Sequence, residues 1–451
     1  EVQEMSTRNR GPAPLSGHVV AVVGAGPAGI YAARKLANAG HAVALINRDV
    51  KPGGLAEYGI YPNKYKMKRG LRKQFGKILG DERVTYLGNV SVGADGHLTL
   101  EQLRGLGFSA VVLAVGAQGT KWLGVEGEEA RGVFHAKDLV YWYNKLPPFA
   151  SMDVQFGKRV AIIGMGNVMV DIAHWLVCHE EGVEEVIVCG RRGPAERKWT
   201  PKEIAYIAAA FDREALTAEM GRIGDGLRAI GQDPDEIHED LVRYCEEPLE
   251  HPSDTRVTFQ FLSSPKRVVA GGDGQVVGLE MERNELVAKG ERIACQATGE
   301  TTVLDVDNVV YAVGDSVDRG LGLPVGWYGF KTGPGDGDEE CYAAWDGDRL
   351  SGVYLVGWAR KASDGLVGKA RQDAERGCEE VEAWLAEQAV PDTAAAATDR
   401  LVELLAGKTR VVSAEDIVAL TAAETAIAES RELPEFKHGV NEEMFAALDE
   451  C

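Results

Sequence analysis

Gly24-Ala25-Gly26-Pro27-Ala28-Gly29 is the stretch of sequence that decides the fold. It follows an apolar run, residues 19–23, and precedes a helix predicted over residues 30–39. Glycines allow a tight turn here, and the amides at the start of the helix can face a pyrophosphate. A second apolar run, Ala42 to Ile46, predicts the next parallel strand. The residue after it, Asn47, stands where a ribose-binding acid is expected, and its amide can bond ribose hydroxyls without bringing a charge.

A second turn of this kind, Gly164-Met165-Gly166-Asn167-Val168, lies between a predicted strand at 160–163 and a helix at 168–177. Met169 occupies the third glycine position, which predicts a displaced helix or a local pocket for the thioether. The strand 186–189 ends in Gly190-Arg191-Arg192, and adjacent guanidinium groups suit a ribose 2′-phosphate. The sequence therefore favours NADP(H) over NAD(H), with a solvated turn as the alternative.

Composition is typical of an enzyme with two domains. The chain has 451 residues, 45% of them hydrophobic, and a formal net charge of −20, which disfavours nucleic acid and anionic membranes as partners. No apolar run is long enough for a membrane span, and residues 1–17 lack the apolar core of a signal peptide, so we expect a cytoplasmic protein. The seven cysteines form no Cys-x-x-Cys pair, which argues against a redox dithiol or an iron–sulfur cluster, and no metal site is predicted.

One segment departs from this acidic balance. Residues Lys64 to Lys77 include seven basic side chains and no acid. Such an island of positive charge would steer a small acidic protein, such as a ferredoxin, to one face of the molecule. The alternative is a solvated amphipathic helix whose charges only maintain solubility.

The order of predicted elements indicates an α/β protein with two Rossmann-like domains, each doubly wound and three-layered in a ββα manner. Strands at 111–116, 309–314 and 353–357 each end in Gly, which suggests that the chain returns to its first domain. We expect a discontinuous first domain at 16–118 and 311–392 and a second at 119–310, the second with a charged helical insertion at about 201–247 and shorter strands near 257–262 and 276–282. A helical extension, 393–451, should pack on the first domain.

Further stretches carry a family resemblance over nearly the whole length. They include Gly132-Val133-Phe134-His135-Ala136-Lys137-Asp138, Gly166-Asn167-Val168 with Asp171, Arg191-Arg192-Gly193-Pro194, and Gly357-Trp358 followed by Gly365-Leu366-Val367-Gly368. The chain resembles the adrenodoxin-reductase family, the flavoprotein NADPH:ferredoxin reductases of mitochondria and bacteria. The resemblance implies FAD and NADP(H) as cofactors and an oxidoreductase of the ferredoxin–NADP(+) reductase type. Hydride transfer between nicotinamide C4 and flavin N5 would be coupled to one-electron exchange with a ferredoxin-like protein.

The resemblance and the glycine turns together supply the candidate binding residues. Those for FAD are Gly24, Gly26, Pro27, Ala28, Gly29, Asn47, Arg48, Gly54, Leu55, Val90, Gly116, Gly357, Trp358, Gly365, Leu366 and Val367. Those for NADP are Gly164, Met165, Gly166, Asn167, Val168, Arg191, Arg192, Glu203 and Gly365. Trp358 offers a flat apolar surface beside an isoalloxazine, although core packing is the simpler alternative.

The candidate catalytic residues are Lys64, Trp358 and Asp364, and two of them, Lys64 and Asp364, depart from the family pattern. Asn63-Lys64 replaces the family's Asp-His pair, so a lysine stands where a histidine is thought to assist proton movement. Asp364 adds a carboxylate that would lower the flavin potential if it points inward. These changes bear on the electron acceptor more than on the cofactors.

Other functions stay open at this level. A subunit of a larger redox complex, similar to the glutamate-synthase small subunit, would need a cysteine-rich region, and none precedes Val19. A flavin monooxygenase would need a substrate pocket, for which the sequence has no distinctive signal. A docking subunit that keeps its nucleotide folds only as a scaffold is disfavoured by the intact glycine turns and the arginine pair.

Overall fold

The computed structural model describes residues 16–246, 249, 253–290, 292–334, 341–362, 365 and 367–450. The chain divides into two compact units. The first comprises Glu1–Thr120, Tyr143–Ser151 and Asp315–Cys451, and the second Lys121–Trp142 and Met152–Gly314. The chain thus leaves the first unit and later returns to it. Within the described ranges, none of the helices combines the length and apolar character needed to span a membrane.

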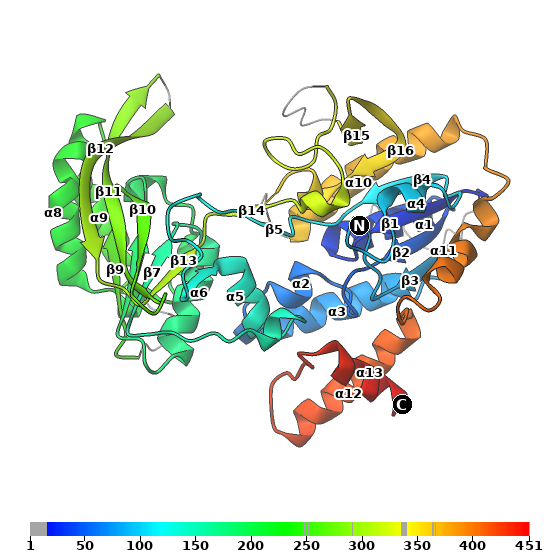
Figure 1. Ribbon diagram of the computed structural model, residues 1–451, viewed down its shortest axis with the longest axis horizontal. Coiled ribbons are helices and arrows are strands. Elements are labelled where there is room, and N and C mark those ends of the chain that lie inside the picture. Colours follow the sequence, from blue (N-terminus) through cyan, green and yellow to red (C-terminus); the bar gives the residue numbers. More distant parts are fainter. Residues whose placement is uncertain are drawn as a thin grey trace, which may run out of the picture. The chain divides into compact units, whose positions relative to one another are not determined.

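The first unit is built on a six-stranded sheet in the order β15-β16-β4-β1-β2-β3 (Figure 1). The strands are β1 (Val19–Val23), β2 (Ala42–Ile46), β3 (Val84–Leu87), β4 (Ala110–Leu113), β15 (Ala343–Asp346) and β16 (Asp348–Leu355). Neighbouring strands are parallel except β15 and β16. The predicted strands at 19–23 and 42–46 are confirmed, and β16 returns beside β4 with Val353 opposite Val111.

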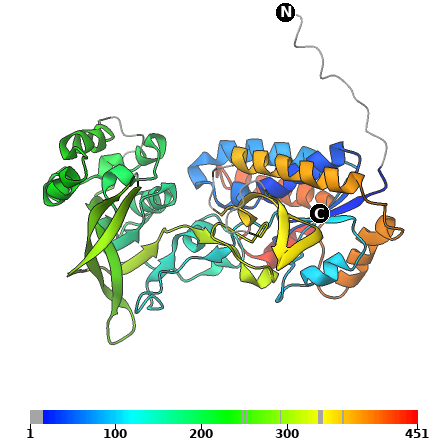
Figure 2. The ribbon, with the colours of Figure 1, turned by 90° about the horizontal axis from the view of Figure 1, so that it is seen from above.

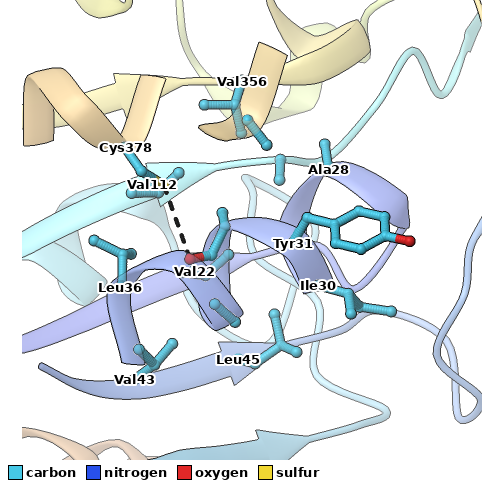
Figure 3. Close-up of a cluster of buried hydrophobic side chains, with 14 of the residues drawn as sticks. Val22, Ala28, Ile30, Tyr31, Leu36, Val43, Leu45, Val112, Val356 and Cys378 are labelled. Atoms are coloured by element: carbon cyan, nitrogen blue, oxygen red, sulfur yellow. Dashed lines mark hydrogen bonds between the residues drawn. The ribbon is translucent and has the colours of Figure 1, made fainter. Parts of the chain in front are cut away.

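Alternating side chains of these strands build two cores, one on each face. Val20 and Val22 face the helices α1 (Pro27–Asn38), α3 (Tyr65–Leu79) and α10 (Val367–Ala386), which lie on one side of the sheet (Figure 2). Figure 3 shows this core, including the contact of 3.8 Å from Cys378 Sγ to the carbonyl oxygen of Ala32. Val19, Ala21 and Val23 face the other core, with α4 (Leu100–Arg104) and α11 (Ala397–Leu405).

The helix after the first glycine turn begins at Pro27, three residues earlier than predicted. Proline fits the first helical position because its fixed φ suits the helix and its missing N–H would have no partner there.

The C-terminal extension contains α12 (Ala414–Ser430) and α13 (Asn441–Asp449). It packs on the first unit through a small apolar cluster of Val50, Val412, Leu420 and Met444. Gly88 and Val412 also form an antiparallel bridge. The short helix α2 (Leu55–Tyr58) and the strands β5 (Gly119–Thr120) and β14 (Asp315–Ser316) complete this unit.

The second unit has a parallel sheet in the order β6-β13-β7-β8-β9. Its strands are β6 (Val133–His135), β7 (Arg159–Ile163), β8 (Glu185–Cys189), β9 (Arg256–Gln260) and β13 (Asn308–Tyr311). The helices are α5 (Ala136–Tyr143), α6 (Asn167–His179), α7 (Pro201–Ile204), α8 (Arg213–Ala229) and α9 (Pro234–Arg243), the last three within the predicted helical insertion. Each unit thus has a largely parallel sheet packed against helices, which makes the fold an α/β pair of dinucleotide-binding domains.

An antiparallel meander of β10 (Ser263–Ala270), β11 (Val276–Lys289) and β12 (Arg292–Leu304) forms the third layer of this unit. Leu279 and Met281 of β11 pack against Val309 and Tyr311 of the parallel sheet. The sequence predicts only the first half of β11 and none of β12. The reason is physical: most of β12 is exposed or half-buried, so it carries no apolar run.

Candidate functional site

The first glycine turn is held so closely that only glycine fits at two of its positions. Gly24 has φ 103°, and a Cβ there would lie 2.4 Å from the carbonyl oxygen of Ala114. A Cβ on Gly29 would lie 1.7 Å from the carbonyl oxygen of Gly24. Gly26, which caps α1, would have its Cβ in open space, with nothing within 4 Å. The turn is therefore tight underneath and open above the first amides of α1, as a bound pyrophosphate requires.

Two further loops close around this opening. Gly54 has φ 49°, and its Cβ would lie 3.0 Å from Cα of Gly26. Gly357 has φ 64°, and its Cβ would lie 2.6 Å from Cβ of Ala28. The N–H of Gly53 also donates to the carbonyl oxygen of Ala25 at 2.7 Å. We call the assembly of Gly24, Gly26, Gly29, Gly54 and Gly357 the first cradle. Its five glycines fit the close approach of a dinucleotide such as FAD.

Asn47 holds the glycine turn of the first cradle through hydrogen bonds to the backbone. It is buried, and its Oδ1 accepts a hydrogen bond from the N–H of Ala25 at 3.0 Å. Its Nδ2 donates to the carbonyl oxygens of Asp49 at 2.8 Å and Lys51 at 3.0 Å. Both amide hydrogens thus have protein acceptors, so in this structure Asn47 serves to fix the glycine turn. Only its carbonyl oxygen retains capacity to accept a further hydrogen bond.

The remaining residues predicted for FAD or catalysis lie at several places in the first unit. Arg48 is exposed and pairs with Asp49 at 2.9 Å, Val90 is buried, Gly116 follows β4 with φ 69°, and Leu55 begins α2. Lys64 ends a short 3-10 helix, Pro62–Lys64, and Trp358 is half-buried in another, Gly357–Ala359. Gly365 has φ 75° and Val367 begins α10, whereas Asp364 and Leu366 lie outside the described residues.

Beneath α2 lies an ionic cluster that the sequence reasoning did not find. Its members are Lys51, Glu57, Lys68, Arg72, Glu424, Glu435 and Lys437. Arg72 donates to both carboxylate oxygens of Glu57 at 2.6 Å and contacts Glu435 at 2.8 Å. Lys51 pairs with Glu424 of α12. The ionic cluster therefore joins the C-terminal extension to α2 and α3. The sequence did not predict the cluster, because single charged residues in a polar tail follow no periodic pattern.

Burial shapes the protonation of this cluster. Burial of Glu57 opposes its charge, but Lys437 and Lys51, with the hydrogen bonds from Arg72, hold its pKa well below the usual value. Burial lowers the pKa of Lys68 to about 8, and the nearby Lys437 acts in the same direction. Lys68 Nζ donates to Asn144 Oδ1 at 2.9 Å.

The basic segment Lys64 to Lys77 is consequently less uniform than predicted. It forms most of α3, but Lys68 is buried and Arg72 is committed to Glu57 and Glu435. Arg69 is exposed and donates to the carbonyl oxygen of Pro434 at 2.6 Å. Lys68 therefore does not contribute to the predicted island of positive charge, because helical periodicity turns that position toward the interior.

The second glycine turn repeats the geometry of the first within the second unit. Gly164 has φ 131°, and a Cβ there would lie 2.2 Å from the carbonyl oxygen of Ala312. Gly166 caps α6, and its Cβ would meet nothing within 4 Å. Asn167 Oδ1 accepts from the N–H of Thr200 at 2.9 Å, and the side chain of Val168 is exposed. We call Gly164, Gly166 and the first turn of α6 the second cradle.

The arginine pair follows β8, the strand next to β7 in this sheet. Arg191 is exposed and Arg192 is half-buried, and neither guanidinium forms an ion pair within the described ranges. The side chain of Met165 packs against Gly190, where a Cβ would lie 2.4 Å from its Sδ. Glu203 is half-buried in α7, and Met169 is fully buried, as the interpretation of a local pocket requires.

Comparison with known proteins agrees with this arrangement. Residues 18–244 match the model of the pyridine nucleotide-disulphide oxidoreductase family. The chain is 31% identical over 392 residues to NADPH-ferredoxin reductase FprA of Mycobacterium tuberculosis, covering 79% of this chain and 82% of that protein. It is 28% identical to the mitochondrial NADPH:adrenodoxin oxidoreductase of Salvelinus fontinalis, covering 80% of this chain and 76% of that protein.

A solved structure extends the likeness to nearly the whole chain. The structure of Mycobacterium tuberculosis FprA in complex with NADPH superposes with a TM-score of 0.78 at 28% identity, covering 97% of this chain and 100% of that one. The two glycine cradles, the arginine pair and these similarities lead to one assignment: the chain belongs to the family of the NADPH-ferredoxin reductases and NADPH:adrenodoxin oxidoreductases.

Proposed function

We propose that the chain is a flavoprotein that moves electrons from NADPH through FAD to a small iron–sulfur protein of the ferredoxin kind. The observation that carries this proposal is the presence of two cradles in separate units, the second beside two arginines that form no ion pair with any residue the structure describes. The printed names of the relatives point the same way.

In this proposal the first cradle, within residues 16–118 and 311–392, holds FAD. FAD supplies the exchange between two-electron and one-electron chemistry. The amides at the start of α1 bind its pyrophosphate, because they point into the opening above Gly26. Gly357 admits the ligand beside Ala28, and Trp358 lies next to it in the chain. Asn47 contributes by fixing Ala25, so the shape of the turn does not depend on the ligand.

The second cradle, within residues 119–310, holds NADP. Gly166 leaves room for the pyrophosphate at the start of α6, and Met165 and Val168 flank it. Arg191 and Arg192 bind the 2′-phosphate, since their guanidinium groups form no ion pair within the described ranges and suit a phosphate. Glu203, in α7, is proposed to contact the bound nucleotide, as the family resemblance implies.

Proton supply to the flavin site is assigned to Lys64. It ends the 3-10 helix that leads into α3, and it occupies the position of the family's histidine. Asp364 lies outside the described residues, so its effect on the flavin potential stays a prediction. Replacement of Lys64 by methionine should slow reduction of the flavin by NADPH while leaving FAD bound, and an unchanged rate of reduction would remove Lys64 from the mechanism.

The docking surface in this proposal is the exposed side of α3. Lys66, Lys73 and Lys77 are exposed and, at spacings of seven and four residues, share one helix face, with Arg69 beside them. An acidic iron–sulfur protein would be attracted to this row. The buried Lys68 takes no part in docking.

Anaerobic stopped-flow reduction tests the function directly. The purified protein with FAD is mixed with NADPH or NADH, and the flavin absorbance is followed. Fast bleaching by NADPH, followed by reoxidation on adding an oxidised ferredoxin, is the expected result. If neither nucleotide bleaches the flavin, the proposal is wrong.

A further inference from the structure

The loop that carries the arginine pair is held by the hairpin of β11 and β12. The carbonyl oxygen of Arg191 accepts two hydrogen bonds from side chains of this hairpin. Asn284 Nδ2 lies 2.9 Å from that oxygen and Cys295 Sγ lies 3.1 Å from it. Asn284 belongs to β11 and Cys295 to β12, so both strands of the hairpin contact the loop.

Asn284 occupies a defined place in the meander. The pairing of β10 with β11 ends at Ser263 opposite Arg283, and Asn284 is the next residue. Its own N–H donates to the carbonyl oxygen of Leu262 at 2.7 Å, and its Nδ2 also contacts Ser264 Oγ at 2.8 Å. The side chain is 3% exposed. Because a carbonyl oxygen can only accept, the amide nitrogen must be the atom that faces Arg191.

The rest of the loop backbone is tied on its other side. The N–H of Gly190 donates to the carbonyl oxygen of Gln260 at 2.9 Å, and the N–H of Ser263 donates to the carbonyl oxygen of Gly190 at 3.0 Å. The main chain that leads into Arg191 is thus fixed by β9 and by the first residue of β10. The two guanidinium groups, by contrast, form no ion pair within the described ranges. This combination of a fixed backbone and available side chains is what a preorganised anion site needs.

We propose that Asn284 is a positioning residue that sets the preference for a 2′-phosphorylated dinucleotide, with Cys295 as a second donor to the same oxygen. The inference rests on the proposed role of Arg191 and Arg192. Loss of the Asn284 bond frees the peptide of Arg191 to rotate, so the guanidinium must be ordered again when the phosphate binds. The second cradle contacts the part of the nucleotide shared by NADPH and NADH and does not depend on this bond.

The test replaces Asn284 by leucine, which has a similar size and no donor. Binding of 2′,5′-ADP and of 5′-AMP is measured by calorimetry, and KM and kcat are measured with NADPH and NADH. We expect the Kd of 2′,5′-ADP and the KM for NADPH to rise about tenfold, because a buried hydrogen bond to the loop is lost. The Kd of 5′-AMP, the KM for NADH and the kcat with NADPH should stay within twofold of wild type.

Thr298→Ala is the matched control. Thr298 also donates from this hairpin to a main-chain oxygen, that of Arg283 at 3.0 Å, but it does not touch Arg191. It should leave every constant unchanged, and an effect equal to that of Asn284→Leu would show general loosening of the hairpin and overturn the inference.

A double variant, Arg191→Ala with Arg192→Ala, distinguishes failure of the positioning role of Asn284 from failure of the proposed 2′-phosphate site. If it weakens 2′,5′-ADP while Asn284→Leu does not, the positioning role is wrong and the proposed function stands. If the arginine variant also leaves 2′,5′-ADP binding unchanged, the proposed 2′-phosphate site itself fails. Should Asn284→Leu not fold, Ser264→Ala combined with Cys295→Ala tests the same support: about threefold weaker 2′,5′-ADP binding is expected, and no change overturns it.

Discussion

Lys437 Nζ donates to the backbone carbonyl oxygen of Glu57 at 2.7 Å and lies 3.0 Å from its carboxylate, although 380 positions separate the two residues. Glu57 belongs to α2, which directly follows Gly54 of the first cradle. The contact makes the C-terminal extension part of the support of that cradle. Removal of the cation would leave a buried carboxylate short of one of its partners.

Lys437→Met should therefore lower the free energy of unfolding by about 3 kcal/mol, the usual cost of breaking a buried ion pair from one side. Urea denaturation of the FAD-free protein, followed by circular dichroism, measures it. Arg410→Ala is the control, because the pair of Arg410 with Asp449 is exposed and should contribute less than about 1 kcal/mol. Equal effects of the two variants would contradict a structural role for the ionic cluster.

Lys68 should make stability depend on pH in the alkaline range. Burial lowers its pKa to about 8, whereas in the unfolded chain it titrates near 10.4. Between these values the unfolded state holds a proton that the folded state has released, so the free energy of unfolding rises with pH. Relative to Lys68→Met, the wild type should gain roughly 2 kcal/mol between pH 7.5 and 10. Lys73→Met, on the exposed side of α3, keeps Lys68 and should therefore show the same rise as the wild type.

Gly26 and Gly29 should respond differently to alanine. A Cβ on Gly26 meets nothing within 4 Å, so Gly26→Ala should fold normally but lose FAD, because the methyl group fills the space above the helix amides. A Cβ on Gly29 would lie 1.7 Å from the carbonyl oxygen of Gly24, so Gly29→Ala should destabilise the fold itself. Flavin content and melting temperature distinguish the two, and full FAD occupancy in Gly26→Ala would refute the assignment of the first cradle.

Arg191→Ala with Arg192→Ala should raise the KM for NADPH by about 100-fold and leave the KM for NADH unchanged. Each lost charge-assisted bond costs about 1.5–3 kcal/mol, and only NADPH carries the 2′-phosphate. Steady-state reduction of a dye with each nucleotide measures the preference. If the KM rises by the same factor for NADPH and NADH, the arginines contact a part of the dinucleotide other than the 2′-phosphate.

Charge reversal at Lys66, Lys73 and Lys77 should slow electron transfer to an acidic ferredoxin about tenfold at low salt, with the difference shrinking as salt is added. Reduction of a small neutral dye should not change. Reversal of three exposed lysines outside α3, Lys121, Lys158 and Lys408, alters the net charge equally and serves as control. If both triple variants slow ferredoxin reduction to the same extent, α3 is not the docking surface.

Much of the first sheet could be predicted because parallel strands buried on both faces are continuous apolar runs. The strands at 19–23 and 42–46 are found as predicted, and Gly24 and Gly164 adopt the positive φ that their turns require. These features are local, and the sequence carries them directly.

Other features depend on partners far away in the chain. Lys68 has the same side chain as Lys66 and Lys73, and only helix orientation and the distant Glu435 distinguish it. The role of Asn47 depends on which oxygens lie within reach of its amide. Asn284 stands in a strand with polar residues on either side, so no pattern singled it out before its contact with Arg191 was seen.

The return of β16 to the side of β4 has a consequence for synthesis of the protein. Val353 pairs with Val111, yet the whole second unit is translated between them. On the ribosome, the edge of β4 therefore waits unpaired while the inserted unit can already fold. The first cradle is finished only when Gly357 has emerged. A nascent chain that stops before Gly357 would contain all residues of the second cradle but would lack one glycine of the first.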